Sequence, residues 1–143
     1  MHQFINQWRD TEFESSTGPT PEFQSFARQF KTALRKEISD AFDIVTFRRG
    51  HFELSGFLRS KETGRFVYWN ISDVRFFRNA WADHVLIRTA TDATDYTGGA
   101  NHFTTLEQFN ETALRLAEAH RPQSATPYAQ ANFSFSPSSR RGA

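Results

Sequence analysis

Residues 20–42 read TPEFQSFARQFKTALRKEISDAF, and the spacing of their apolar side chains decides the fold. Thr20 is a favourable N-cap, Pro21 suits the first helical position and Glu22 suits the first turn. Apolar residues then recur at steps of three and four, at Phe23, Phe26, Ala27, Phe30, Leu34, Ile38 and Phe42. This spacing predicts an amphipathic helix over about 21–42, because such steps place the apolar side chains on one stripe of a helix.

Beyond this stretch the apolar residues follow the two-residue period of β-strands. Residues 51–59 and 65–71 both alternate, and the short connection between them predicts a hairpin in which Gly64 takes a positive φ. Two further strands are predicted, one at 44–47 from its β-forming residues and one at 85–90, which has the composition of a buried strand.

A second helix is predicted near the end of the periodic sequence. Thr105 and Gln108 have the spacing of a capping box, and the apolar residues that follow predict a helix over about 105–120. Together these elements predict an α+β domain, in which a four-stranded antiparallel sheet is flanked by an N-terminal and a C-terminal helix. We expect both helices to cover the same face of the sheet.

The segments on either side of the domain lack a regular period. Residues 1–20 are predicted to form an N-terminal arm, which the side chains of Phe4, Ile5, Trp8 and Phe13 could still dock onto the body. Residues 21–120 form the α+β domain. Residues 121–143 are rich in Ser, Pro and Arg and are predicted to be a flexible tail.

Composition excludes several classes of protein. The chain of 143 residues has a mean hydropathy of -0.63, and no window approaches the roughly 18 unbroken apolar residues of a membrane span. No secretory signal is visible, so we expect a cytoplasmic protein without membrane contact. The absence of cysteine excludes disulfides, thiolate zinc sites and cysteine nucleophiles. Five scattered histidines and the lack of GxSxG, Walker and GxGxxG motifs predict no catalytic residues, no metal site and no cofactor.

The most informative irregular segment is 91–103, thirteen residues without periodicity. A long irregular connection in a small domain is often functional. We therefore predict that the segment and the arginine before it form a binding site. Its candidate residues are Arg88, Asp92, Asp95, Tyr96, Gly98, Gly99, Asn101 and His102.

The glycine pair of this segment has two interpretations. Gly98 and Gly99 are expected to turn through positive φ and to present bare N–H groups to a ligand or an anion. The alternative is a turn that only redirects the chain.

A second candidate surface mixes aromatic and basic side chains around the predicted hairpin. Such mixtures stack bases and neutralise phosphates, so they indicate a nucleic-acid or partner surface. The alternative is that the aromatic side chains fill the core. Its residues are Arg48, Arg49, Arg59, Lys61, Arg65, Tyr68 and Trp69, with Phe57 nearby.

Four short segments are similar to small proteins encoded by phages, prophages and plasmids. They are GHF at 50–52, YWNISDVR at 68–75, LIRTA at 86–90 and DYTGGAN at 95–101, and the likeness spans roughly 42–109. The resemblance implies an accessory protein of a mobile element, a class that includes inhibitors of host defence such as anti-CRISPR proteins. It implies no catalytic or binding residue.

The leading hypothesis is a non-enzymatic binding protein that inhibits a host defence protein or ribonucleoprotein complex by occupying one of its surfaces. The charge is segregated, with eight basic against five acidic residues in 43–91 and one against five in 92–120. The acidic groups could therefore mimic phosphates in a basic channel.

Two alternatives stay open. The chain could bind or convert a nucleotide, with Arg88 on a phosphate, the amides of Gly98 and Gly99 as donors and Tyr96 on the base. It could also bind RNA or DNA directly. The sequence leaves the oligomeric state open.

Overall fold

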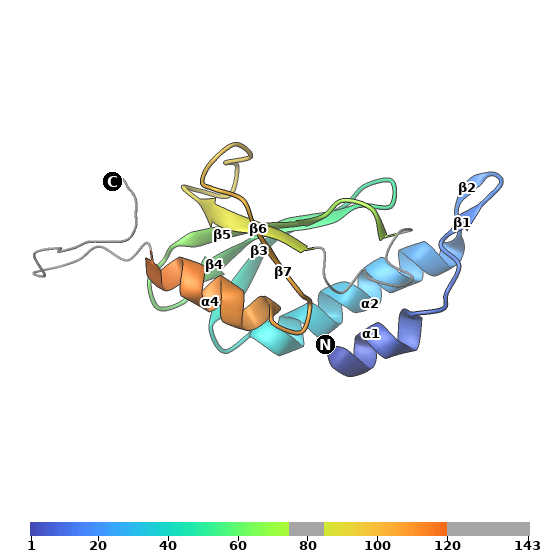
Figure 1. Cartoon of the computed structure of the whole chain (residues 1–143), viewed down its shortest axis with the longest axis horizontal. Helices are drawn as coiled ribbons and strands as arrows, with labels where there is room; N and C mark the ends of the chain where they lie inside the picture. The colour runs from blue at the N-terminus through green and yellow to red at the C-terminus, as the bar shows by residue number, and fades with distance from the viewer. Residues whose placement is uncertain (75–84, 120–143) are drawn as a thin grey trace, which may run out of the picture.

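The computed structural model describes residues 1–74 and 85–119, and Figure 1 shows how their helices and strands are arranged. The helices are α1 (His2–Trp8), α2 (Pro21–Ile38) and α4 (Phe109–Ala119). A small sheet pairs β1 (Glu14–Ser15) with β2 (Gly18–Pro19). The main sheet contains β3 (Phe42–Arg49), β4 (Leu54–Ser60), β5 (Phe66–Ile71), β6 (Val85–Ala90) and β7 (His102–Thr104). The chain is therefore α+β, as predicted.

The main sheet is antiparallel throughout, in the order β3-β4-β5-β6-β7. It has five strands, so the prediction of four is wrong by one. The added strand, β7, pairs His102 with Ile87 and Thr104 with Val85. A strand of three residues is too short for its alternation to be recognised, and it begins within the segment 91–103 that we predicted to be irregular.

The two long helices are shorter than the sequence predicts. The helix α2 ends at Ile38, and Phe42 opens β3 although its buried side chain continues the apolar spacing of the helix. The Thr105 hydroxyl accepts a hydrogen bond from the Gln108 amide at 3.0 Å. This bond therefore fixes the turn before α4, and the helix itself begins only at Phe109.

The predicted hairpin is present as β4 and β5, with Gly64 at a φ of 73°. The first strand begins at Leu54 rather than at residue 51. Residues 50–53 instead form a tight turn, closed by a hydrogen bond of 2.7 Å from the Gly50 amide to the Glu53 carbonyl. Phe52 takes a positive φ of 68° in this turn, and the burial of its ring against Phe23 holds that unusual conformation.

Both helices cover one face of the sheet, as expected. The indole of Trp69 on β5 lies 5.7 Å from the Phe30 ring of α2 and 6.0 Å from the Phe109 ring of α4, between ring centroids. Figure 1 shows α2 and α4 on the same side of the sheet. Trp69 is fully buried, so its assignment to a partner surface is wrong and the alternative, a core aromatic, holds for it. We call the opposite side of the sheet the open face.

Residues 1–20, which we predicted to be an arm, are folded onto this core. The side chains of Ile5 and Phe13 are buried in it. The rings of Phe4 and Trp8 each lie 5.5 Å from that of Phe26 on α2. The expected docking residues therefore do make contact. Two turns of helix are too few to show a period, so the sequence did not indicate α1.

The predicted tail, 121–143, lies outside the described residues. Within those residues, no helix is both long enough and apolar enough to cross a bilayer.

Phe30 tests whether the aromatic layer between α2 and the sheet stabilises the fold. Its fully buried ring lies between those of Phe4, Phe26, Phe47 and Trp69. Phe30→Ala is expected to lower the free energy of unfolding by about 3–5 kcal/mol, through lost transfer energy and a cavity. Chemical denaturation measures the change.

The matched control is Gln24→Ala on the exposed side of the same helix, expected to change stability by at most about 0.5 kcal/mol. Equal stability of the two variants would contradict this description of the core.

Candidate functional site on the open face

A row of side chains crosses the open face on neighbouring strands. The register pairs Thr46 of β3 with Phe57 of β4, Phe57 with Tyr68 of β5, and Tyr68 with Arg88 of β6. Because successive side chains of a strand point to opposite faces, Tyr68 points away from the helices that cover Trp69. The sheet therefore gathers residues from both predicted sites.

The loop of residues 91–101 folds over this row. Figure 1 shows the loop between β6 and β7 on the side of the sheet away from the helices. The Tyr96 ring stands edge-on to those of Phe57 and Tyr68, with centroids 5.1 and 5.8 Å apart. Phe57 is fully buried, whereas Tyr96 is 48% exposed. Tyr96 therefore covers the Phe57 ring and exposes the other side of its own ring to solvent.

Arg48 completes this arrangement from β3. Its Nη1 donates a hydrogen bond of 3.2 Å to the Tyr96 hydroxyl, and its guanidinium carbon lies 5.8 Å from the centre of the same ring. The Tyr68 hydroxyl in turn accepts a hydrogen bond of 3.1 Å from the side-chain amide nitrogen, Nδ2, of Asn70. We call Arg48, Phe57, Tyr68, Arg88 and Tyr96 the aromatic–arginine cluster.

Arg88 fastens the loop to the sheet. Only 3% of the residue is exposed. Its Nη2 donates to the Asp95 carbonyl at 2.9 Å and its Nη1 to the Thr89 carbonyl at 3.2 Å, while the guanidinium carbon lies 4.4 Å from the Tyr68 ring centre. The carbonyls and the ring compensate the buried charge. This engagement argues against the predicted role of Arg88 as a partner for a phosphate.

The two aspartates of the loop bond within it. Asp92 Oδ1 accepts hydrogen bonds from the Thr94 hydroxyl at 2.7 Å and the Thr94 amide at 2.8 Å. Asp95 accepts from the amides of Thr91, at 2.9 Å, and Thr97, at 3.1 Å. These bonds favour the charged carboxylates, so they lower the pKa of both below the ordinary 3.8. The bonds occupy acceptor sites that phosphate mimicry would need.

Gly98 and Gly99 differ from the prediction. Positive φ values among the described glycines occur at Gly18 and Gly64, so the expected positive φ at this pair is wrong. A Cβ on Gly98 would instead lie 2.2 Å from Asp95 Oδ2, and one on Gly99 would lie 2.5 Å from Thr89 Oγ1. Glycine is required here because the loop packs closely on itself and on β6.

The remaining loop residues lie toward β7. Asn101 and His102 are exposed, and His102 begins the strand. Phe103 pairs with Leu86 and is 68% exposed. It is the functional candidate that the sequence reasoning missed. The only sequence feature that could have indicated Phe103 is its position as an apolar residue at the end of a polar segment.

The predicted basic surface is divided between separate places. Arg48 joins the cluster, whereas the guanidinium of its neighbour Arg49 lies 6.0 Å from the buried Phe23 ring. Arg59, Lys61 and Arg65 lie at the far end of the β4–β5 hairpin. Of the five predicted basic residues, Arg48 of β3 thus joins the cluster, through its contacts with Tyr96.

No group of three His, Asp or Glu side chains suitable for a metal ion occurs within residues 1–74 and 85–119. No protein-family model, curated protein or solved structure matches this chain. The resemblance to proteins of phages and plasmids therefore stays a prediction.

The Asp95 hydrogen bonds make the loop sensitive to acid. Because they lower the pKa of Asp95, they stabilise the loop above the ordinary pKa of 3.8 and are lost as the pH falls through the lower value of the folded state. In an NMR titration we expect the amide signals of Thr91 and Thr97 to shift in a transition whose midpoint lies below pH 3.8. In Asp95→Asn this transition should disappear.

The control for that titration is Asp40→Asn, an exposed residue distant in sequence, which should leave the transition of the Thr91 and Thr97 amides in place. A midpoint above pH 3.8 in the wild-type protein would contradict the lowered pKa.

Proposed function

We propose that this chain is a non-catalytic binding protein that inhibits a host defence complex by occupying one of its surfaces with the open face. The observation that carries the proposal is the exposure of two aromatic side chains on that face, Tyr96, which contacts Arg48 of β3, and Phe103 on the edge strand β7. Three large hydrophobic side chains are exposed in the described part of the chain, and these two are the aromatic ones. Tyrosine and arginine are enriched where binding energy concentrates.

The cluster is held in place before any partner arrives. Tyr96 is fixed by Phe57, Tyr68 and the Arg48 hydrogen bond. Arg88 fixes the backbone of the loop at Asp95. A surface that is ordered in the free protein loses less conformational entropy on association, so more of its contact energy appears as affinity.

The chemistry of the cluster suits recognition of a partner. Its functional groups are phenols, a phenyl ring and guanidinium groups, which offer stacking surface and hydrogen bonds. The cluster therefore suits contact with another macromolecule. The assignment to host defence rests on the resemblance to proteins of mobile elements.

Single-stranded nucleic acid is the second candidate partner. It is favoured by aromatic side chains on neighbouring strands of an antiparallel sheet with helices on one face only. One fact opposes it: Phe57, a ring on which a base could stack, is buried under Tyr96. An affinity that falls steeply between about 50 and 200 mM salt would identify this partner instead.

The proposal is tested by measuring binding of the full chain to purified host defence complexes, and inhibition of their activity. The double variant Tyr96→Ala with Asn101→Ala should stay folded and lose at most about 2 kcal/mol of stability, since both residues are exposed although Tyr96 covers Phe57. The double variant should weaken binding at least about tenfold, because an anchor of the interface is removed.

A second pair of variants tests whether binding depends on the open face or only on the net charge of the protein. Arg48→Ala should weaken binding, whereas Arg35→Ala, which removes the same charge from the exposed side of α2, should not. Equal effects of the two substitutions, or no complex bound by the wild-type chain, would refute the proposal.

A further inference from the structure

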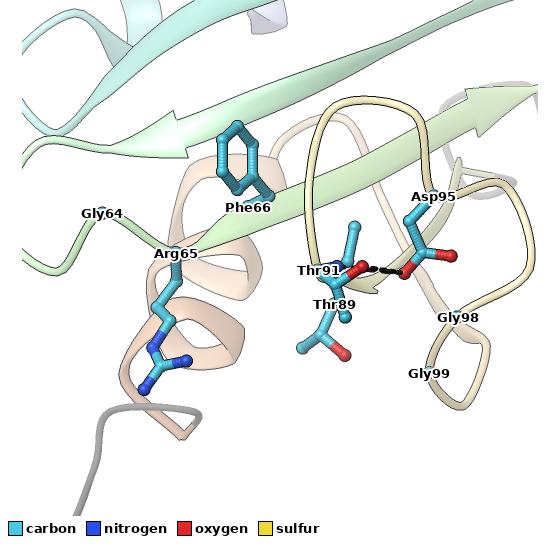
Figure 2. Close-up of a pocket in the computed structure, with 9 residues that line it drawn as sticks. Gly64, Arg65, Phe66, Thr89, Thr91, Asp95, Gly98 and Gly99 are labelled. Carbon is cyan, nitrogen blue, oxygen red and sulfur yellow. Dashed lines mark hydrogen bonds between the residues drawn. The ribbon is translucent and has the colours of Figure 1, made fainter.

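A hollow of about 350 Å³ lies at the end of the sheet where β5 begins and β6 ends. Its walls include Arg65 and Phe66 of the hairpin, Thr89 of β6, and Gly98 and Gly99 of the loop (Figure 2). The volume falls within the range of small-molecule sites, about 300–1,000 Å³. The hollow is separate from the aromatic–arginine cluster, although the loop contributes to both.

The hollow is lined by hydrogen-bond donors that the described chain does not use. The Arg65 guanidinium makes no hydrogen bond or ion pair with the described residues, and neither the Thr89 hydroxyl nor the amides of Gly98 and Gly99 donate to one of them. Among the lining residues, the amide and the hydroxyl of Thr91 both donate to the Asp95 carboxylate (Figure 2). Because Gly99 has no side chain, its backbone closely approaches the Thr89 hydroxyl.

Two further cations lie next to the hollow, with two acidic side chains beside them. The Arg59 guanidinium lies 6.0 Å from the Phe66 ring centre and has no ion pair within the described residues. Arg59 and Lys61 line a second hollow of about 380 Å³ together with Asp43 and Glu62, and both hollows meet at Gly64. One acidic side chain, Asp95, lines the first hollow, and its carboxylate already accepts bonds from Thr91 and Thr97.

We propose that this hollow binds the phosphate group of a small phosphate ester, such as a nucleotide. A guanidinium offers two parallel N–H donors that match two phosphate oxygens, and it stays charged at every physiological pH. Backbone amides and a hydroxyl supply further neutral donors of the kind that surround bound phosphates. In Figure 2, Arg65 and Thr89 extend to one side of the strands and Phe66 to the other. The phosphate therefore lies on the side of Arg65, Thr89 and Gly99.

A small ligand fits this geometry better than a nucleic-acid strand. A strand needs a continuous basic track. Beyond Arg59 the next cation, Lys61, donates a hydrogen bond to the Ser39 carbonyl at 2.5 Å and lies 3.9 Å from Asp43 Oδ1. The track therefore ends at the hairpin. The proposal does not rest on the host defence function, because the residues that bind the phosphate lie outside the cluster.

The full chain is titrated with inorganic phosphate, AMP, ATP and a thymidine oligonucleotide, by calorimetry and by thermal unfolding. A ligand of the native state raises the melting temperature with its concentration. We expect a rise with the nucleotides. The affinity should fall at least about tenfold in Arg65→Gln, which loses a charged pair of donors. Thr89→Val, which removes only the hydroxyl, should weaken binding less.

The matched control is Arg28→Gln on the exposed side of α2, which makes the same change of charge and should bind like the wild type. In an NMR titration with AMP, the amide signals of Gly98 and Gly99 should shift, and this readout needs no variant to fold. The proposal is overturned if the Gly98 and Gly99 amide signals do not shift, or if no phosphate probe binds. It is also overturned if Arg65→Gln and Arg28→Gln lose affinity equally. Preference for the oligonucleotide over the nucleotides would also overturn it, in favour of a nucleic-acid site.

Discussion

The packing of the Trp69 indole determines which face of the sheet the protein leaves open. Trp69 lies in the centre of the sheet and contacts Phe30 of α2, Phe47 of β3 and Phe109 of α4. Because both long helices bury their apolar sides against this one layer, neither covers the other side of the sheet. Because the side chains of a strand alternate between its two faces, Phe57 and Tyr68 then face away from the core. An aromatic side chain in that position needs another cover, and the 91–101 loop supplies it.

The loop acts as a partial second layer, and it is held by groups that are unusual in a surface segment. A buried guanidinium is costly unless its donors are used, and Arg88 uses them on the Asp95 and Thr89 carbonyls. The Asp95 carboxylate closes the loop on itself through Thr91 and Thr97. One residue thus joins the loop to the sheet through its carbonyl and shapes the loop through its side chain. The predicted binding segment is ordered by its own polar groups.

The elements with clear periodicity could be predicted, and the contacts between distant segments could not. The spacing from Phe23 to Ile38 predicted α2, and the alternation around Gly64 predicted the hairpin. Period two already implied that Tyr68 and Trp69, adjacent on one strand, point to opposite faces, so assigning both to a surface was avoidable. The position of Tyr96 over Phe57 could not be predicted, because it depends on Arg88 and on a loop whose sequence shows no periodicity. A glycine pair likewise does not reveal whether it serves a positive φ or a close approach.

The two proposed sites share one structural element, and that has a thermodynamic consequence. Residues 98 and 99 border the hairpin hollow, while Tyr96, two residues earlier, forms part of the open face. A phosphate bound at Arg65, Thr89 and Gly99 would favour the loop conformation that seats Tyr96 over Phe57. A partner that requires that conformation would then bind more tightly, and linkage requires the partner to strengthen phosphate binding by the same factor. The coupling free energy can be no larger than the free energy by which the bound phosphate favours the loop conformation that seats Tyr96 over Phe57. A loop that already holds this conformation in the free protein would therefore leave the two sites independent.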